Sequence, residues 1–399
     1  MTSSLRVILF NQDESCAAAL RRELLRCEGL QIVAELDEPT MLPQAVGQFP
    51  AELLVVHLDP QPTEMLDIAA RIAASRPALA VFAVSESLES GLILRALRAG
   101  LREYLTKPLD PETLAAAVGR VAEARPARTK QGRIVSVCGT TGGAGATTIA
   151  VNLACELAEL TGEPVGMLDL DFRFGQLTTL LDLQPSFSIA DLCDSHEQID
   201  QQMIERAMVK HGTHVHVLAR PHHLAQAEQI TAATCAGVLA GMQELYDHIV
   251  IDGPHRFDGS GKVVLDMADV SLMVVLLLVT SVRNADRLLG ELAGEGYNLD
   301  RIRLIANRLG RESGYLEPQH VEATLNRKVF ATICDDWRTV SASINSGQPL
   351  ITAAPKSRVR QAIRELARQL LASETDADAA DEARAPVRLF QRIFKTESA

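Results

Sequence analysis

The sequence predicts an α/β protein made of two doubly wound, three-layer domains. Short β-branched runs alternate with amphipathic helical stretches in two successive blocks, which is typical of parallel sheets with crossover helices. Between the blocks, residues 123–133 (EARPARTKQGR) are polar, basic and proline-containing, and they lack hydrophobic periodicity. The length of 399 residues allows more than one domain. We therefore expect domains at 1–122 and 134–372, joined by a linker at 123–133.

The composition is that of a globular chain, with 47% hydrophobic and 23% charged residues. A net charge of −12 repels phosphate backbones, and only 4% of the residues are aromatic, so a nucleic-acid partner is not expected. The seven cysteines are scattered, without a C-x-x-C pair or a secretory leader ahead of them, which indicates a cytoplasmic protein. The longest apolar run, Leu272 to Val279, is too short to cross a bilayer and is predicted to be a buried strand.

Five strands are expected in the first domain, with amphipathic helices at Ser15–Arg26 and Ser90–Ala99. The strands are Arg6–Phe10, Gln31–Glu35, Leu53–Leu58, Ala80–Ser85 and Glu103–Leu105. The run AGLREYLTKP at 99–108, together with Ser85, resembles the last strand and lysine-proline turn of the response-regulator receiver family. This resemblance implies a flavodoxin-like, receiver-like domain.

The phosphorylation site of that family is altered here. The first strand runs into Asn11-Gln12-Asp13 instead of a group of acids, and His57 stands at the position of the phosphoryl-accepting aspartate. Because Asn and Gln bind Mg²⁺ poorly, the usual phosphorylation is not expected. Asp59 could accept a phosphoryl group only with a register shift of two residues, which keeps the same face of the strand. We expect a docking or dimerisation domain whose remnant residues are Asp13, His57, Ser85 and Lys107.

The second block opens with a strand at Ile134–Val137, a glycine-rich run at 139–148 and a helix at Thr147–Leu160. This order aims backbone N–H groups and a helix N-terminus at one point, which makes an anion site. Glycines allow the positive φ angles and the close approach that such a turn needs. Further strands are expected at Val165–Asp169, Val215–Leu218, His248–Ile251, Leu272–Val279 and Arg303–Ala306.

This block resembles the ParA/MinD class of P-loop ATPases, whose loop reads K-G-G-x-G-K-T-T. Both lysines of that loop are missing, since Thr141 and Ala146 occupy their positions. The resemblance implies ATP and Mg²⁺ as ligands, and no other metal. The nucleotide-binding residues it implies are Gly142, Gly143, Ala144, Gly145, Ala146, Thr147, Thr148, Asn307 and Pro349.

Three more segments match that class. Asp171, at the end of Leu168-Asp169-Leu170-Asp171, corresponds to its catalytic or water-positioning aspartate. Asp252, in Asp247–Pro254, corresponds to its Walker B residue, which is associated with Mg²⁺ together with Thr147. Asn307 ends the strand that contacts adenine, and Pro349 lies in a loop near the nucleotide.

The missing lysines should weaken binding and hydrolysis unequally. One hydrogen bond to a charged group contributes about 1.5–3 kcal/mol, so the loss of the loop lysine should weaken nucleotide binding about 10- to 100-fold. Hydrolysis depends on cations that offset charge in the transition state, so slow or absent turnover is expected. Arg173 and Lys262 are the candidates for a substitute cation.

Two remaining segments have their own interpretation. Five histidines (His211, His214, His216, His222 and His223) invite a metal site, but no cysteine accompanies them at ligand spacing. Residues 373–385 are acidic and alanine-rich and are expected to be disordered. The tail at 386–399 is an amphipathic, basic helix candidate for a weak membrane contact or a partner protein. Its apolar residues are Leu389, Phe390, Ile393 and Phe394.

An unphosphorylatable receiver followed by a ParA/MinD-type domain with an atypical loop resembles the TadZ/CpaE family of pilus-assembly proteins. That resemblance implies a homodimeric scaffold that localises the Tad (Flp, type IVb) pilus secretion machinery at the cell pole and the inner membrane face. Its partners would be the secretion motor and the inner-membrane platform proteins. Two alternatives are an active ParA/MinD-like positioning ATPase and an atypical response regulator that gates its second domain.

Overall fold

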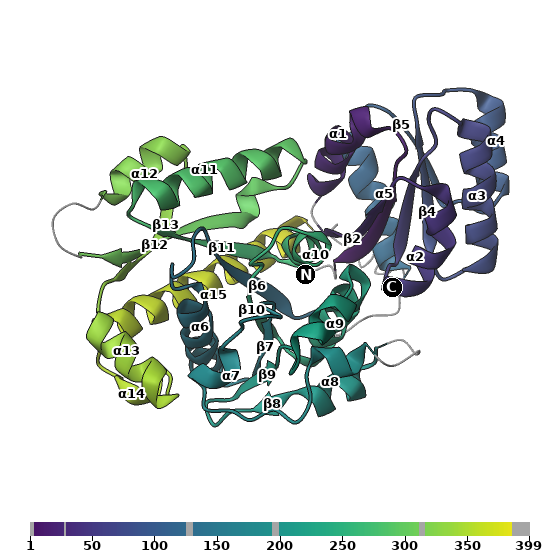
Figure 1. Cartoon of the computed structure of the whole chain (residues 1–399). Helices are drawn as coiled ribbons and strands as arrows, with labels where there is room; N and C mark the ends of the chain where they lie inside the picture. The colour runs from purple at the N-terminus through teal and green to yellow at the C-terminus, as the bar shows by residue number, and fades with distance from the viewer. Residues whose placement is uncertain (1–3, 28, 125–130, 194–198, 311–315, 385–399) are drawn as a thin grey trace, which may run out of the picture.

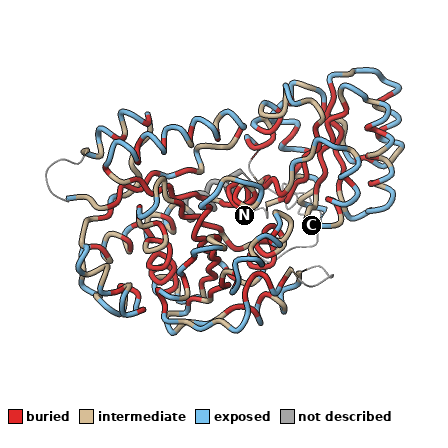
Figure 2. Tube along the Cα trace, viewed as in Figure 1, coloured by how far each residue is buried: buried red, intermediate tan, exposed pale blue. Residues whose placement is uncertain are grey.

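The computed structural model describes residues 4–27, 29–124, 131–193, 199–310 and 316–384. Two α/β domains lie side by side, each built on a largely parallel sheet with helices on both faces (Figure 1). Buried residues follow the strands of both sheets, and the outer helix faces are exposed (Figure 2).

The first domain has a parallel sheet in the order β2-β1-β3-β4-β5, one of the two common doubly wound orders. Its strands are β1 Leu5–Phe10, β2 Leu30–Leu36, β3 Leu53–His57, β4 Ala80–Ser85 and β5 Glu103–Thr106. Helices α1 Glu14–Leu25 and α5 Pro111–Glu123 pack on one face. The other face carries α2 Leu42–Gln48, α3 Pro62–Ser75 and α4 Ser90–Arg98, with a 3-10 turn η1 Pro39–Met41 before α2. All five predicted strands and both predicted helices are present within one residue at each end.

The second domain has eight strands in the order β13-β12-β11-β6-β10-β7-β9-β8, of which β8 alone is antiparallel to its neighbour. The strands are β6 Arg133–Gly139, β7 Val165–Asp169, β8 Val209–Lys210, β9 Val215–Leu218, β10 His248–Asp252, β11 Val270–Leu276, β12 Ile302–Leu309 and β13 Val329–Cys334. Helices α6 Ala146–Thr161, α7 Leu177–Leu180 and α15 Arg358–Arg384 pack on one face. Helices α9 Ala232–Leu245, α10 Gly259–Met267, α11 Val279–Gly294 and α12 Pro318–Leu325 cover the other.

The remaining short elements of this domain are α8 Gln201–Ala207, α13 Trp337–Ser346, α14 Leu350–Ala353, η2 Ile189–Leu192, η3 Leu224–Gln229 and η4 Leu299–Arg301. The predicted strand Leu272–Val279 is too long, because β11 ends at Leu276 and Val279 begins α11. A continuous apolar run does not mark where a strand ends and a helix begins. Strands β8 and β13 were not predicted. β8 has two residues and β13 is mostly half-exposed, so neither reads as a buried strand.

The expectation of disorder at 373–385 is wrong as far as Arg384, where α15 ends. Alanine and glutamate have high helix propensity, and the prediction considered the acidic charge of the segment and not this propensity. The predicted linker 123–133 overlaps the end of α5 and the start of β6. The tail residues Leu389, Phe390, Ile393 and Phe394 lie outside the described residues. Across the described ranges, no helix combines the length and the apolar character that a membrane span requires.

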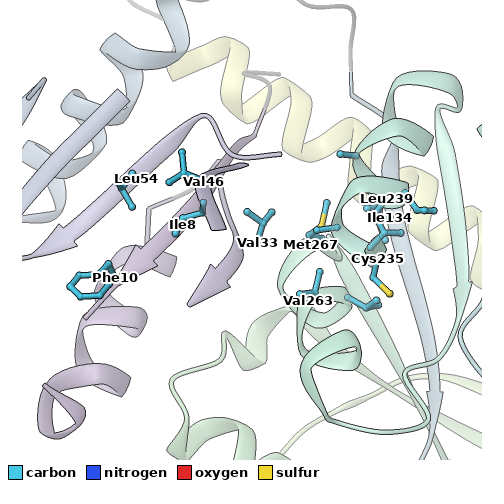
Figure 3. Packing of buried hydrophobic residues seen from close by; sticks show 14 of the residues in the cluster. Ile8, Phe10, Val33, Val46, Leu54, Ile134, Cys235, Leu239, Val263 and Met267 are labelled. Atoms are coloured by element: carbon cyan, nitrogen blue, oxygen red, sulfur yellow. The ribbon is translucent and has the colours of Figure 1, made fainter. Parts of the chain in front are cut away.

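The two domains share one hydrophobic core. Val33 of β2 points toward Met267 and Val263 of α10, while Ile8 and Leu54 pack behind it within the first domain (Figure 3). Burial of side chains from both sheets in one cluster excludes water from the boundary. The first domain is therefore packed against the second as part of one folded unit.

A buried ion pair crosses the same boundary. Arg21 of α1 pairs with Asp266 of α10, and both side chains are less than a tenth exposed. The guanidinium of Arg21 also lies 4.1 Å from the ring centroid of Tyr297. Gln31 Nε2 donates to the carbonyl oxygen of Met267 at 3.0 Å. The first domain thus contacts the helix that follows the β10 loop of the second domain.

Candidate functional site

A glycine-rich loop connects β6 to α6 at the carboxyl edge of the second sheet. Gly143 and Gly145 have φ angles of +73° and +96°, which L side chains rarely adopt. Gly145 is the N-cap of α6, and as a glycine it has no side chain that could accept a hydrogen bond from the first turn. The first amides of this helix, together with those of the loop, therefore face the same point and can bind an anion.

Two consecutive residues at the end of β12 bind the carbonyl side of this loop. Asn307 Nδ2 donates to the carbonyl oxygen of Ala144 at 2.7 Å, and Arg308 Nη2 donates to that of Gly143 at 2.9 Å. Asn307 is buried, and its Oδ1 accepts the backbone N–H of Arg308 at 2.9 Å. A Cβ at Gly145 would lie 2.5 Å from Asn307 Nδ2, so glycine is required there. The loop is held in shape from behind.

The two positions that lack lysine are filled by small side chains. Ala146 is buried at the start of α6, and Thr141 Oγ1 is buried with no hydrogen-bond partner among the described residues. Thr147, in the first turn of α6, is half-buried. In this region the structure brings Asn307 into contact with the loop that holds the predicted residues Gly142 to Thr148.

Two carboxylates stand side by side at the ends of neighbouring strands. Asp252 of β10 and Asp169 of β7 are register partners, and both are almost completely buried. Burial and the charge of Asp252 raise the pKa of Asp169 to about 7. Asp169 accepts the amides of Leu177 and Asp171, but neither oxygen of Asp252 has a hydrogen-bond partner in the described part of the chain.

The unsatisfied carboxylate of Asp252 fits a hydrated magnesium ion. A buried carboxylate without a partner is costly, and a Mg²⁺ ion that keeps several waters would supply both charge and donors. The hydroxyl of Thr147 is an oxygen of the kind that Mg²⁺ prefers, at the start of the helix that follows the loop. The residues present therefore suit the metal that accompanies a nucleotide.

Asp171 lines a pocket of about 570 Å³ that lies between residues 170–174 and 254–261. Its Oδ1 accepts the amides of Phe174 at 2.9 Å and Arg173 at 3.3 Å, so it also stabilises its own turn. His255 lines the same pocket, 3.6 Å from Asp252. Burial lowers the pKa of His255, but the neighbouring carboxylate of Asp252 and the charges of Asp171 and Asp169 outweigh this and raise it.

Pro349 reaches the site through α6. Asn152 Nδ2 donates to the carbonyl of Thr148 at 2.8 Å, and its Oδ1 accepts the amide of Leu350 at 2.7 Å. This pair of bonds attaches the Pro349–Leu350 turn to the first turns of the helix that the loop precedes. The structure thus places Pro349 beside the first turns of α6, and its contact with a nucleotide stays a prediction.

The candidate substitute cations are engaged elsewhere. Lys262 pairs with Glu295 at 2.7 Å, and Arg173 lies 3.7 Å from Glu228 on an exposed turn. Arg308, which the sequence analysis did not single out, is the arginine that binds the loop itself. Its signal in the sequence was weak, because it is one basic residue directly after Asn307.

In the first domain, the predicted remnant residues meet at the carboxyl edge of the sheet. His57 ends β3, is fully buried, and its Nδ1 lies 2.6 Å from Asn11 Oδ1. Its Nε2 lies 3.2 Å from Lys107 Nζ and 3.3 Å from Asp59. Because Asn11 uses its amide group on the carbonyl of Asp13, the geometry fits a neutral imidazole that donates from Nδ1 and accepts from Lys107 at Nε2.

The other members of this cluster are also satisfied. Asp59 lies in the loop after β3 and accepts Ser85 Oγ at 3.0 Å and the amide of Glu86 at 2.8 Å. Asp13 caps α1 by accepting the amide of Ser15. Burial and the charge of Lys107 lower the pKa of His57. The polar side chains of this cluster are therefore bonded to one another or to the neighbouring backbone.

The histidines of the second domain do not come together at one site. His216 Nδ1 lies 3.1 Å from the hydroxyl of Tyr246, and His211 Nδ1 lies 2.8 Å from Thr213 Oγ1. Over the residues that are described, no group of three or more His, Cys, Asp or Glu side chains is arranged to hold a metal ion.

The chain resembles known ATPases. Residues 132–292 match the AAA domain family. The septum site-determining protein MinD of Thermotoga maritima is 26% identical over 245 residues, which cover 60% of this chain and 88% of that protein. A ParA family ATPase from Chlorobium tepidum superposes with a TM-score of 0.57 at 23% identity, covering 61% of this chain and 100% of that one. MinD of Pyrococcus horikoshii, complexed with Mg-ADP, superposes with a TM-score of 0.53 at 21% identity, covering 60% and 95%.

A weaker similarity involves a candidate pilus assembly protein (cpaE) from Burkholderia thailandensis. It covers 30% of this chain and 98% of that one, with a TM-score of 0.28 at 23% identity. A similarity of this size carries no argument about function.

Proposed function

We propose that the second domain, which is similar to the ParA/MinD family of P-loop ATPases, binds ATP with Mg²⁺ at its lysine-free loop and hydrolyses it slowly or not at all. The observation that carries the proposal is that α6 begins without a side-chain cap, together with the buried carboxylate of Asp252, which accepts no hydrogen bond from the described residues and has His255 at 3.6 Å. The first suits a phosphate and the second suits its hydrated metal.

Affinity and turnover should respond differently to the absent lysines. The amides of the loop and the metal still bind the phosphates, so binding at the millimolar ATP of a cell is expected. Transition-state charge in phosphoryl transfer requires cations near the reacting phosphate. Asp171 would position the water. Among the described residues that line its pocket, the basic groups are Arg173, His255 and Arg256, and none of them stands at the position of a loop lysine in the sequence.

Equilibrium binding and turnover on the purified full-length chain test this proposal. We expect Mg²⁺-dependent ATP binding with a dissociation constant at or below about 1 mM and turnover well below about 1 s⁻¹, the low end of common enzymes. Turnover above that rate contradicts the structural role of the nucleotide. Absence of Mg²⁺-dependent binding at millimolar ATP contradicts the whole proposal.

We further propose that the chain is a homodimeric assembly factor that localises the Tad pilus secretion machinery at the inner membrane face and the cell pole. The support is the combination of a first domain whose acceptor position is His57 with an ATPase domain whose loop lacks both lysines. This combination resembles the TadZ/CpaE family. The tail at 386–399 would add a weak membrane or partner contact.

Co-purification with the Tad secretion motor and its inner-membrane platform proteins tests this second proposal. We expect capture of the motor by the full-length chain in the presence of Mg-ATP, and loss of motor localisation when the gene is deleted. Normal motor localisation without the protein contradicts the proposal. The response-regulator alternative has less support, because His57 is buried and bonded at the acceptor position.

A further inference from the structure

One of the two residues that bind the carbonyl groups of the glycine-rich loop has an unusual backbone. Arg308 has a φ angle of +60°, a left-handed conformation that L side chains rarely adopt. The Oδ1 of buried Asn307 accepts the N–H of Arg308 and so holds this conformation. The strain places the guanidinium against the carbonyl of Gly143. Strain of this kind is found where a side chain must be aimed at a functional site.

The direction of these bonds decides what the two residues can do. In a loop, a carbonyl points roughly opposite to the neighbouring N–H groups, so a donor to the carbonyls lies behind the anion-binding face. Asn307 and Arg308 occupy two consecutive carbonyls, those of Ala144 and Gly143. Their bonds therefore keep the amides pointed forward without filling the anion position.

We propose that Arg308, positioned by Asn307, is the residue that keeps this lysine-free loop in its anion-binding shape. The inference rests on the proposed nucleotide binding and deepens it. In the part of the chain that the structure describes, no carboxylate pairs with Arg308, whereas Arg173 and Lys262 each have one. Arg308 is a positioning residue, because it acts on the phosphates through the loop amides.

Substitution by glycine separates the side chain from the backbone. Arg308→Gly removes the guanidinium but adopts φ +60° without strain, so the fold and Asn307 should be retained. We expect Mg²⁺-dependent binding of a fluorescent ATP analogue to weaken about tenfold in the full-length protein, the size of one charged hydrogen bond. The thermal unfolding midpoint without nucleotide should stay equal to that of the wild type or rise.

Conservative variants test the positioning role. Arg308→Lys and Arg308→Gln each keep one donor for the Gly143 carbonyl and should bind within about threefold of the wild type, since the bond itself is retained. The matched control is Arg303→Ala, which removes an exposed arginine of the same strand that lies over Phe330 and leaves the loop untouched. This control should bind like the wild type.

A lysine restored at position 146 should make Arg308 dispensable. In an Ala146→Lys background, Arg308→Gly should cost less than about threefold, because the two groups order the same loop and their effects are not additive. Wild-type affinity in Arg308→Gly, or a tenfold loss in Arg308→Gln as well, overturns the inference and leaves the proposed function standing. A wild-type chain that binds no analogue overturns both.

Discussion

The carboxyl edges of the two sheets are equivalent places, where doubly wound proteins bind their ligands, yet they are finished differently. At the first edge, His57 contacts Asn11, Lys107 and Asp59, so the polar groups satisfy one another. At the second edge, both buried oxygens of Asp252 accept no hydrogen bond from the described residues, with His255 at 3.6 Å, and α6 begins without a side-chain cap. The polar groups of the first edge satisfy one another, whereas those of the second fit the nucleotide and Mg²⁺ proposed above.

The difference teaches how a site can lose its usual residues with opposite results. In the first domain the replacing residue, His57, is large and pairs with the remaining lysine, so the cavity closes. In the second domain the replacing residues, Thr141 and Ala146, are small and do not fill the space in front of the loop. The carbonyl side of the loop is bonded by Asn307 and Arg308. Four substitutions test this contrast.

The largest effect is expected from Gly145→Ala at the carboxyl edge of the second sheet, called the open edge here. The new Cβ would lie 2.5 Å from Asn307 Nδ2 on a backbone with φ +96°, so either the loop or Asn307 must move. We expect nucleotide affinity to fall by about 100-fold or more, since strain at a left-handed residue and a lost hydrogen bond add up to about 2–3 kcal/mol. Isothermal titration measures it.

Gly290→Ala, in α11, is the control for that experiment. A Cβ at Gly290 meets nothing within 4 Å and the residue lies outside the loop, so this variant should bind like the wild type. If Gly145→Ala binds within threefold of the wild type, the loop does not depend on contact with Asn307, and the second edge is not held in the way described.

At the carboxyl edge of the first sheet, called the closed edge here, His57→Ala should lower the free energy of unfolding by about 2–3 kcal/mol, because it removes a buried imidazole together with its bonds to Asn11 and Lys107 and leaves Lys107 with Glu86 at 3.3 Å. Urea denaturation measures the change. The double variant His57→Leu with Lys107→Met replaces both partners by apolar groups and should recover much of the loss. Equal stability of His57→Ala and the wild type would mean that the first edge is not held closed by this cluster.

Asp252→Asn should raise the stability of the nucleotide-free protein and lower its affinity for the nucleotide. Without nucleotide, the variant should be more stable, because the change removes a buried carboxylate that accepts no hydrogen bond from the described residues and lies 3.6 Å from His255. With nucleotide, the Mg²⁺-dependent part of the affinity should fall about tenfold, which corresponds to 1.4 kcal/mol. Differential scanning fluorimetry with and without Mg-ATP measures both. Asp258→Asn, at the start of α10, is the control, and a loss of stability without nucleotide in Asp252→Asn contradicts the interpretation.

The sequence predicted the strands well because each is a short apolar run that ends at a polar or glycine residue, as β6 does at Gly139. The glycine loop was predicted for the same local reason. Arg308 was missed because its bond to Gly143 joins residues 165 positions apart, across strands that are not neighbours in the sheet. The shared core of the domains was missed because Val33 and Met267 look like ordinary core residues of their own domains.

The smallest effect concerns pH at the closed edge. Burial and the charge of Lys107 hold the pKa of His57 below its ordinary value of 6.5. The charged groups around it are Lys107 at the end of β5, Asp59 and Glu86 in neighbouring loops, and Asp13 before α1. Because the unfolded chain binds more protons than the folded one between the lowered pKa and 6.5, stability should fall as the pH drops below about 6.5.

His57→Gln removes the titrating group, so its urea midpoint should change less between pH 7 and pH 5.5 than that of the wild type. His222→Gln, which replaces an exposed histidine, is the matched control and should follow the wild type. The comparison uses the difference between variants, because carboxylates elsewhere titrate in both. A wild-type midpoint that rises on acidification relative to His57→Gln would mean that the imidazole is protonated in the folded state. Lys107 could not then donate to it, and the first edge would not be closed by a neutral histidine.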